Sequence, residues 1–152
     1  MTETRALVLD ANILIGAVLG MKVSSVLETY HDHIEFFAPD VAFADAYRHV
    51  PGQLERRGMG MDRGIRRLEM LESVINRVPL EKYEPMRDEA LARIARRDPD
   101  DWPVLAVALV LNCPIWTQDQ DFFGTGVATW TTDRVGLFLR NRPALSSQDN
   151  AD

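Results

Sequence analysis

Short apolar runs alternate with segments of helical spacing along most of this chain. Runs typical of buried strands cover residues 6–9, 34–38, 78–80, 115–117 and 127–130. Between them, apolar residues recur every three or four positions, which predicts helices over residues 11–19, 22–31, 40–50, 62–76, 85–96, 98–111 and 133–140. Strands that alternate with helices are typical of βαβ units. The pattern therefore predicts an α/β fold, a three-layer α/β/α sandwich with a central parallel sheet.

Glycine and proline indicate where the predicted helices end. Gly20 is a suitable cap for the first helix, and Pro51-Gly52 predicts a break in the helix that opens at Pro39-Asp40. That helix is expected to place four residues on or near its core side: Val41, Phe43, Tyr47 and Val50. A helical insertion around residues 52–76 is the one irregularity in the alternation. We expect a single domain over residues 1–142, followed by a polar, frayed tail over residues 143–152.

Composition restricts the class of protein and its partners. The 152 residues are 46% hydrophobic and 26% charged, as in an ordinary globular domain, and the net charge is −6. An acidic protein needs a local basic patch or bound cations to hold a polyanion. The single cysteine, Cys113, fits a reducing cytoplasm. The longest apolar run, residues 104–111, is too short to span a bilayer, so we expect a cytoplasmic protein without a membrane partner.

Four aspartates occupy related places in this pattern. Asp10 and Asp119 each follow a predicted strand, Asp101 opens the most apolar helix, and Asp45 lies at the edge of another helix. In a parallel sheet the carboxyl ends of the strands and the helix starts that follow them share one rim. Like charges about 4 Å apart repel by about 4 kcal/mol at an effective dielectric of 20. A fold keeps such a cluster only with a cation or with shifted pKa values. Each aspartate alone is better explained as a helix cap or a surface acid, but together they predict a site for Mg²⁺ or Mn²⁺.

Arginines cluster in the middle of the chain. Five lie within twelve residues: Arg56, Arg57, Arg63, Arg66 and Arg67. They are either a solvated helix face or a surface that contacts phosphates, and with Arg48 they are the candidates for RNA binding.

Three sequence blocks resemble the signature blocks of PIN domains. They are Val8-Leu9-Asp10-Ala11-Asn12-Ile13-Leu14, Asp98-x-x-Asp101 with its following apolar helix, and Ile115-Trp116-Thr117-Gln118-Asp119-Gln120-Asp121-Phe122. The resemblance runs from about residue 6 to residue 140. It implies a three-layer fold and metal-dependent cleavage of RNA. Many small members are toxins of the VapC type, which are inhibited by a partner antitoxin and are usually homodimers.

The resemblance also implies roles for particular residues. Asp10, Asp101 and Asp119 match the family's metal-binding acids, while Asn12 and Thr117 match the polar residues that support them. The remaining family acid is usually a glutamate, and its place is taken here by Asp45, which is one methylene shorter. Asp121 and Asp98 are secondary metal candidates that a cap or a turn explains equally well.

The resulting hypothesis is a ribonuclease in which Asp10, Asp45, Asp101 and Asp119 hold Mg²⁺ or Mn²⁺ for attack on an RNA phosphodiester. One alternative is a non-catalytic PIN-like nucleic-acid-binding or scaffold domain, in which Asp45 leaves the metal site too weak. A second alternative is a phosphoryl-transfer protein that forms an aspartyl phosphate. The haloacid-dehalogenase type would need a second aspartate two residues after the first, where Asn12 stands, and a receiver domain would need a suitably placed lysine.

Overall fold

The computed structural model describes residues 5–140, which form five strands, eight α-helices and three short 3-10 helices. The strands are β1 (Arg5–Leu9), β2 (Ile34–Pro39), β3 (Ile75–Val78), β4 (Ile115–Trp116) and β5 (Thr129–Trp130). The α-helices are α1 (Ala11–Leu19), α2 (Met21–Tyr30), α3 (Asp40–Arg56), α4 (Met61–Leu71), α5 (Leu80–Tyr83), α6 (Arg87–Ile94), α7 (Trp102–Leu111) and α8 (Val135–Arg140). The 3-10 helices are η1 (Glu84–Met86), η2 (Pro99–Asp101) and η3 (Gln120–Phe122). The predicted tail, residues 143–152, lies outside the described residues.

The five strands form one parallel sheet in the order β3-β2-β1-β4-β5. The first strand of the chain is thus the central one, and the chain crosses over it between β3 and β4. Leu9 pairs with Trp116, so the ends of β1 and β4 lie side by side. The next residues of each strand, Asp10 and Thr117, therefore emerge at the same rim.

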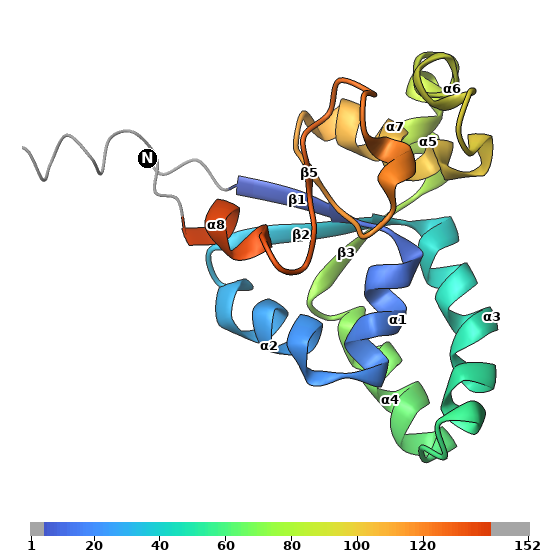
Figure 1. Cartoon of the computed structure of the whole chain (residues 1–152), viewed down its shortest axis with the longest axis vertical. Helices are drawn as coiled ribbons and strands as arrows, with labels where there is room; N and C mark the ends of the chain where they lie inside the picture. The colour runs from blue at the N-terminus through green and yellow to red at the C-terminus, as the bar shows by residue number, and fades with distance from the viewer. Residues whose placement is uncertain (1–4, 141–152) are drawn as a thin grey trace, which may run out of the picture.

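The sheet is covered on both faces, as predicted (Figure 1). Helices α1 to α4 lie on one side of the sheet, and α5, α6 and α7 lie on the other. Strand β1 contributes to both cores, because Leu7 and Leu9 pack with α1 to α4 whereas Val8 packs with α7. A strand buried on both faces has to be apolar at every position, which explains its continuous hydrophobic run. The three-layer α/β/α sandwich is confirmed.

The boundaries around the helical insertion differ from the prediction. Helix α3 does not break at Pro51-Gly52 but continues to Arg56, because Val50 and Leu54 on either side of Pro51 are both fully buried. Burial of these side chains outweighs the backbone hydrogen bond that a proline removes. Val41, expected toward the core, is 42% exposed. The insertion thus consists of two parts, the last turns of α3 and the whole of α4. Helix α4 packs against α1 and α3.

The strand that follows α4 begins earlier in the sequence than expected. Residues 75 and 76, predicted as the end of a helix, belong to β3, and Leu80 begins α5 rather than ending a strand. Pairing of Ile75 to Val78 with β2 decides this, since a strand at a sheet edge gains backbone hydrogen bonds that its local sequence does not reveal.

Two further features of residues 5–140 bear on the sequence predictions. No single helix in this part of the chain is long and apolar enough to cross a bilayer, and α1 with α2, which reach that length only together, are bent by 103°. Burial raises the pKa of the Cys113 thiol to about 12, which makes it a poor nucleophile at neutral pH.

Candidate metal centre

Asp10 is fixed at the junction between β1 and α1. Its Oδ1 atom accepts a hydrogen bond from the backbone N–H of Ile13 at 3.0 Å, which caps the helix. Its Oδ2 atom accepts a hydrogen bond from the hydroxyl of Thr117 at the end of β4. Burial raises the pKa of Asp10, and the bond from Thr117 opposes the rise. Asp10 is therefore both a helix cap and a buried carboxylate held from two sides.

Thr117 connects Asp10 to the third signature block. Its side chain is buried, and its oxygen accepts the backbone N–H of Asp119 at 2.9 Å while its hydroxyl donates to Asp10. Asp119 in turn accepts the N–H of Asp121 at 2.9 Å and caps η3. One threonine hydroxyl thus sets the position of two of the predicted metal-binding acids.

Asp101 is the cleft acid that has a buried oxygen, Oδ2, without a hydrogen-bond partner among the described residues. Partial burial, together with the negative charges of Asp98, Asp119 and Asp10, raises the pKa of Asp101 to about 7. A partly buried carboxylate whose buried oxygen lacks a hydrogen-bond partner, and which has other acids around it, is unfavourable unless a proton or a cation joins it.

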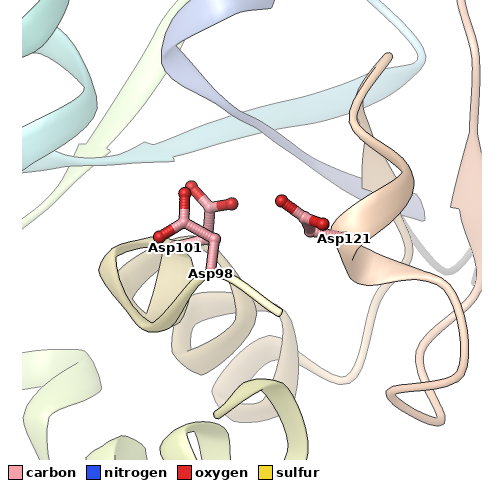
Figure 2. Close-up of side chains that lie close together, drawn as sticks. All are labelled: Asp98, Asp101 and Asp121. Carbon is pink, nitrogen blue, oxygen red and sulfur yellow. The ribbon is translucent and has the colours of Figure 1, made fainter. Parts of the chain in front are cut away.

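The tightest group of acids on residues 5–140 consists of Asp98, Asp101 and Asp121. One carboxylate oxygen from each lies within 4.8 Å of the others. Figure 2 shows Asp98 and Asp101 beside each other, just before α7 begins, with Asp121 facing them from the opposite segment. Asp98 and Asp121, which we expected to be secondary, therefore stand next to Asp101 (Figure 2). Asp98 also caps η2 by accepting the N–H of Asp100 at 3.0 Å.

The four predicted acids line one cleft of about 440 Å³ at the carboxyl ends of the strands. The cleft is lined by Asp10, Asn12, Asp45, Asp100, Asp101 and Asp119, among others. Asp100 was not predicted, because a run of Asp-Pro-Asp-Asp does not show which side chains face inward. Helix α3 also brings Arg48 and His49 to the cleft wall. The Nη2 atom of Arg48 lies 2.9 Å from Oδ1 of Asp45, and the Asp45 side chain is 44% exposed.

The arginine cluster is divided by the fold. Arg67 is turned inward, where its Nη2 donates to the carbonyl oxygens of Ala17 and Gly20 at 3.1 and 3.2 Å. It ties α4 to the α1–α2 turn, which gives it a structural role that the sequence did not reveal. The other four are exposed and lie outside the cleft, near the junction of α3 and α4: Arg56, Arg57, Arg63 and Arg66.

A parallel α/β/α sandwich with clustered carboxylates at the ends of its central strands defines the class of protein. The chain belongs to the PIN domain family, whose sequence model matches residues 8–140. A comparison with curated proteins finds none that matches this sequence.

Solved structures share the fold at low sequence identity. VapBC2 from Rickettsia felis, solved with a DNA fragment from its promoter, has a TM-score of 0.63 and 12% identity, covering 83% of this chain and 98% of that chain. A toxin–antitoxin complex from Klebsiella pneumoniae has a TM-score of 0.59 and 17% identity, covering 83% and 97%. A Pyrobaculum aerophilum protein has a TM-score of 0.65 and 15% identity, covering 90% and 89%. The chain is therefore a PIN domain whose structural relatives include proteins of toxin–antitoxin complexes.

Proposed function

We propose that this PIN domain is a metal-dependent endoribonuclease that hydrolyses RNA phosphodiester bonds with Mg²⁺ or Mn²⁺. The observation that carries the proposal is the convergence of four acids on one cleft. Asp10, Asp45, Asp101 and Asp119 come from four separate segments, and one of their buried oxygens, Oδ2 of Asp101, has no protein partner on residues 5–140. Such an oxygen is unfavourable unless a proton or a cation joins it, and the convergence of the other three acids on the same cleft supports the cation.

The donor set fits a hard divalent cation. The acidic side chains of the cleft offer carboxylate oxygens, which are the ligands that Mg²⁺ and Mn²⁺ prefer. Asp10, Asp101 and Asp119 would hold the ion, and Asp45 would complete the set of acids around it. A bound ion would supply Lewis-acid activation of the phosphodiester. Asp98 and Asp121 add negative charge beside Asp101 and so strengthen the attraction for a cation.

Hydrogen bonds within the protein fix the orientation of the Asp10 carboxylate. The hydroxyl of Thr117 holds the Asp10 carboxylate, and α1 holds its other oxygen, so this acid needs no reorganisation when a cation arrives. Partial burial and the neighbouring acids raise the pKa of Asp101 to about 7, so the cation-free site takes up a proton more readily than an ordinary carboxylate. Binding of a cation displaces that proton, so affinity for Mn²⁺ increases with pH.

The activity is tested by cleavage of single-stranded RNA with Mg²⁺, with Mn²⁺ and with a chelator. We expect cleavage with either ion, none with the chelator, and none by the Asp10→Asn variant, which keeps the helix cap and the fold. Asp88→Asn, which removes an exposed acid on α6 outside the cleft, is the matched control and should cleave normally. Unchanged cleavage by Asp10→Asn would disprove the assignment.

We further propose that the protein acts in the cytoplasm as the toxin of a toxin–antitoxin pair, as a homodimer inhibited by an antitoxin. The fold shared with a Klebsiella pneumoniae toxin–antitoxin complex supports this partner. A short neighbouring reading frame for a DNA-binding protein would identify the candidate. Expression of the PIN domain alone should arrest growth, and co-expression of that neighbour should restore it. Growth that is unaffected by the PIN domain would contradict the toxin role.

One observation favours the alternative of a non-catalytic PIN-like scaffold. Asp45 is half exposed and already forms an ion pair with Arg48. A cation would have to compete with Arg48 for this carboxylate, which makes Asp45 a weaker ligand than the other acids of the cleft. Titration with Mn²⁺ separates the two functions. Thermal stabilisation that disappears in Asp119→Asn supports the nuclease, whereas the absence of any Mn²⁺ effect on the wild-type protein supports the scaffold.

A further inference from the structure

One exposed face of α3 leads from the metal cleft toward the far end of the helix. Asp45, His49, Gly52 and Arg56 follow one another at intervals of four, three and four residues, which places them along a single stripe, with Arg48 beside it. Asp45, Arg48 and His49 line the cleft, and the positions farther along are exposed. We call these five residues the α3 track: Asp45, Arg48, His49, Gly52 and Arg56.

Gly52 in the middle of the α3 track is not explained by packing. A Cβ atom built at Gly52 would meet no atom within 4 Å. Gly64 on α4 is different, because a Cβ there would lie 2.4 Å from Cδ1 of Leu54. Glycine inside a helix destabilises it relative to alanine. The fold therefore requires glycine at position 64 but has no steric need for it at position 52, where its absent side chain leaves the helix backbone open to an approaching ligand.

The charges on the α3 track suit a polyanion that enters an acidic cleft. The protein carries a net charge of −6 and the cleft is lined by five aspartates, so a polyanion needs cationic contacts near the entrance. Arg48 uses one guanidinium nitrogen for Asp45, its side chain is 66% exposed, and its other donors remain available. Arg56 is exposed and has no ion pair with any residue in 5–140. Helical side chains generally lean toward the N-terminus of their helix, which from position 56 is the direction of the cleft.

We propose that single-stranded RNA leaves the cleft along the α3 track, with its backbone crossing Gly52 and one of its phosphates bound by Arg56. This inference rests on the proposed function and adds the path of the substrate. Asp45 and Arg56 are eleven residues apart, which corresponds to about 16 Å along the helix axis. That distance equals about five nucleotides at a stacked rise of about 3.4 Å. An RNA shorter than this fills the cleft without reaching Arg56.

The first test compares two neighbouring arginines of equal charge. Arg57 is exposed like Arg56 but lies about 120° around the helix from Asp45, off the track. Each arginine is changed to alanine in the Asp10→Asn background, and binding of fluorescein-labelled single-stranded RNA is measured by anisotropy with Mn²⁺ present. With an RNA of about ten nucleotides, Arg56→Ala should weaken binding about fivefold and reduce the salt-dependence slope by about 0.7, while Arg57→Ala has little effect. With about three nucleotides the two variants should bind equally.

The second test uses Gly52. Gly52→Ala should raise Tm by about 2–4 °C, because alanine favours the helix and meets no neighbour. Gly52→Met should also preserve the fold, but its long side chain should lower the affinity for the longer RNA and raise KM with little change in kcat. Binding of the longer RNA that is unaffected by Gly52→Met would overturn the path across this residue.

The outcomes separate this inference from the proposed function. Equal losses in Arg56→Ala and Arg57→Ala would overturn the track while cleavage by the wild-type protein still stands. If the wild-type protein does not cleave RNA, the binding comparison still tests the track. Competition by polyglutamate as strong as that by unlabelled RNA would assign the surface to an acidic protein partner and overturn the RNA path.

Discussion

The two walls of the metal cleft are built in different ways. On the sheet side, Asp10 is only 7% exposed and Thr117 1% exposed, and a chain of hydrogen bonds joins Asp10, Thr117, Asp119 and Asp121. On the helix side, Asp45 and Arg48 are paired with each other in contact with solvent. The sheet wall is thus held by buried hydrogen bonds, whereas the helix wall is held by one ion pair between side chains exposed to solvent.

This difference indicates how the work is divided between the walls. Carboxylates held in place before a cation arrives give a precise site, and strand ends in register are the most rigid place for them. Exposed arginine and aspartate side chains suit a substrate that has to enter and leave. Substitutions in the sheet wall should therefore affect stability and metal binding together while the fold is kept, whereas those in the helix wall should affect binding with little change in stability.

Thr117→Val should have the largest effect. Valine removes the donor to buried Asp10 and the acceptor for the N–H of Asp119, so we expect a loss of about 2–3 kcal/mol of stability and loss of RNA cleavage. Thr125→Val is the control, because Thr125 is also buried but bonds the Phe122 carbonyl at 2.7 Å outside the cleft. It should lose about 1 kcal/mol and still be stabilised by Mn²⁺. Urea unfolding with and without Mn²⁺ measures both; equal Mn²⁺ responses in the two variants would contradict the distinction.

The pH dependence tests the centre of the cleft. The pKa of Asp101 is about 7 in the folded protein and near 3.8 when the chain is unfolded, so between these values the folded state holds a proton that the unfolded state lacks. The contribution of Asp101 therefore makes the metal-free protein less stable as pH increases from about 4 to about 7, with no further change above.

Asp101→Asn removes this contribution, and we expect the metal-free variant to gain about 1–2 kcal/mol at pH 8, a value reduced for partial exposure. At pH 4 it should equal the wild-type protein. Asp100→Asn, which removes the adjacent cleft acid, should keep the wild-type pH slope. Thermal unfolding at several pH values provides the measurement, and the same slope in Asp101→Asn as in wild type would refute the assignment of the titration.

Asp45→Asn should have the smallest effect on folding. The side chain is 44% exposed and its pair with Arg48 is a surface ion pair, so stability should change by less than about 0.5 kcal/mol. Affinity for Mn²⁺ should decrease, because one carboxylate of the cleft is lost, whereas Asp45→Glu should retain or improve it. Calorimetric titration with Mn²⁺ distinguishes these results. A large loss of stability in Asp45→Asn would show that the helix wall is as rigid as the sheet wall.

Much of the fold and of the candidate site was predictable from local sequence. Five short apolar runs alternate with helical patterns, and that alternation is sufficient to indicate a parallel sheet covered on both faces. Asp10 and Thr117-x-Asp119 directly follow strands, and parallel strands end at a common edge. The sequence alone therefore indicates that Asp10 and Thr117 converge, although they are more than a hundred positions apart.

Only the tertiary structure decided which helices continue and which side chains face one another. Pro51-Gly52 is a break signal in sequence, yet α3 continues because Val50 and Leu54 are buried against distant residues. Arg67 turned inward to bind carbonyl groups near Gly20. The unpaired oxygen of Asp101 depends in the same way on packing between segments far apart in the chain. Local patterns indicate which kinds of element follow one another and which polar residues follow the strands, whereas element boundaries, burial and orientation depend on neighbours that only the folded chain brings together.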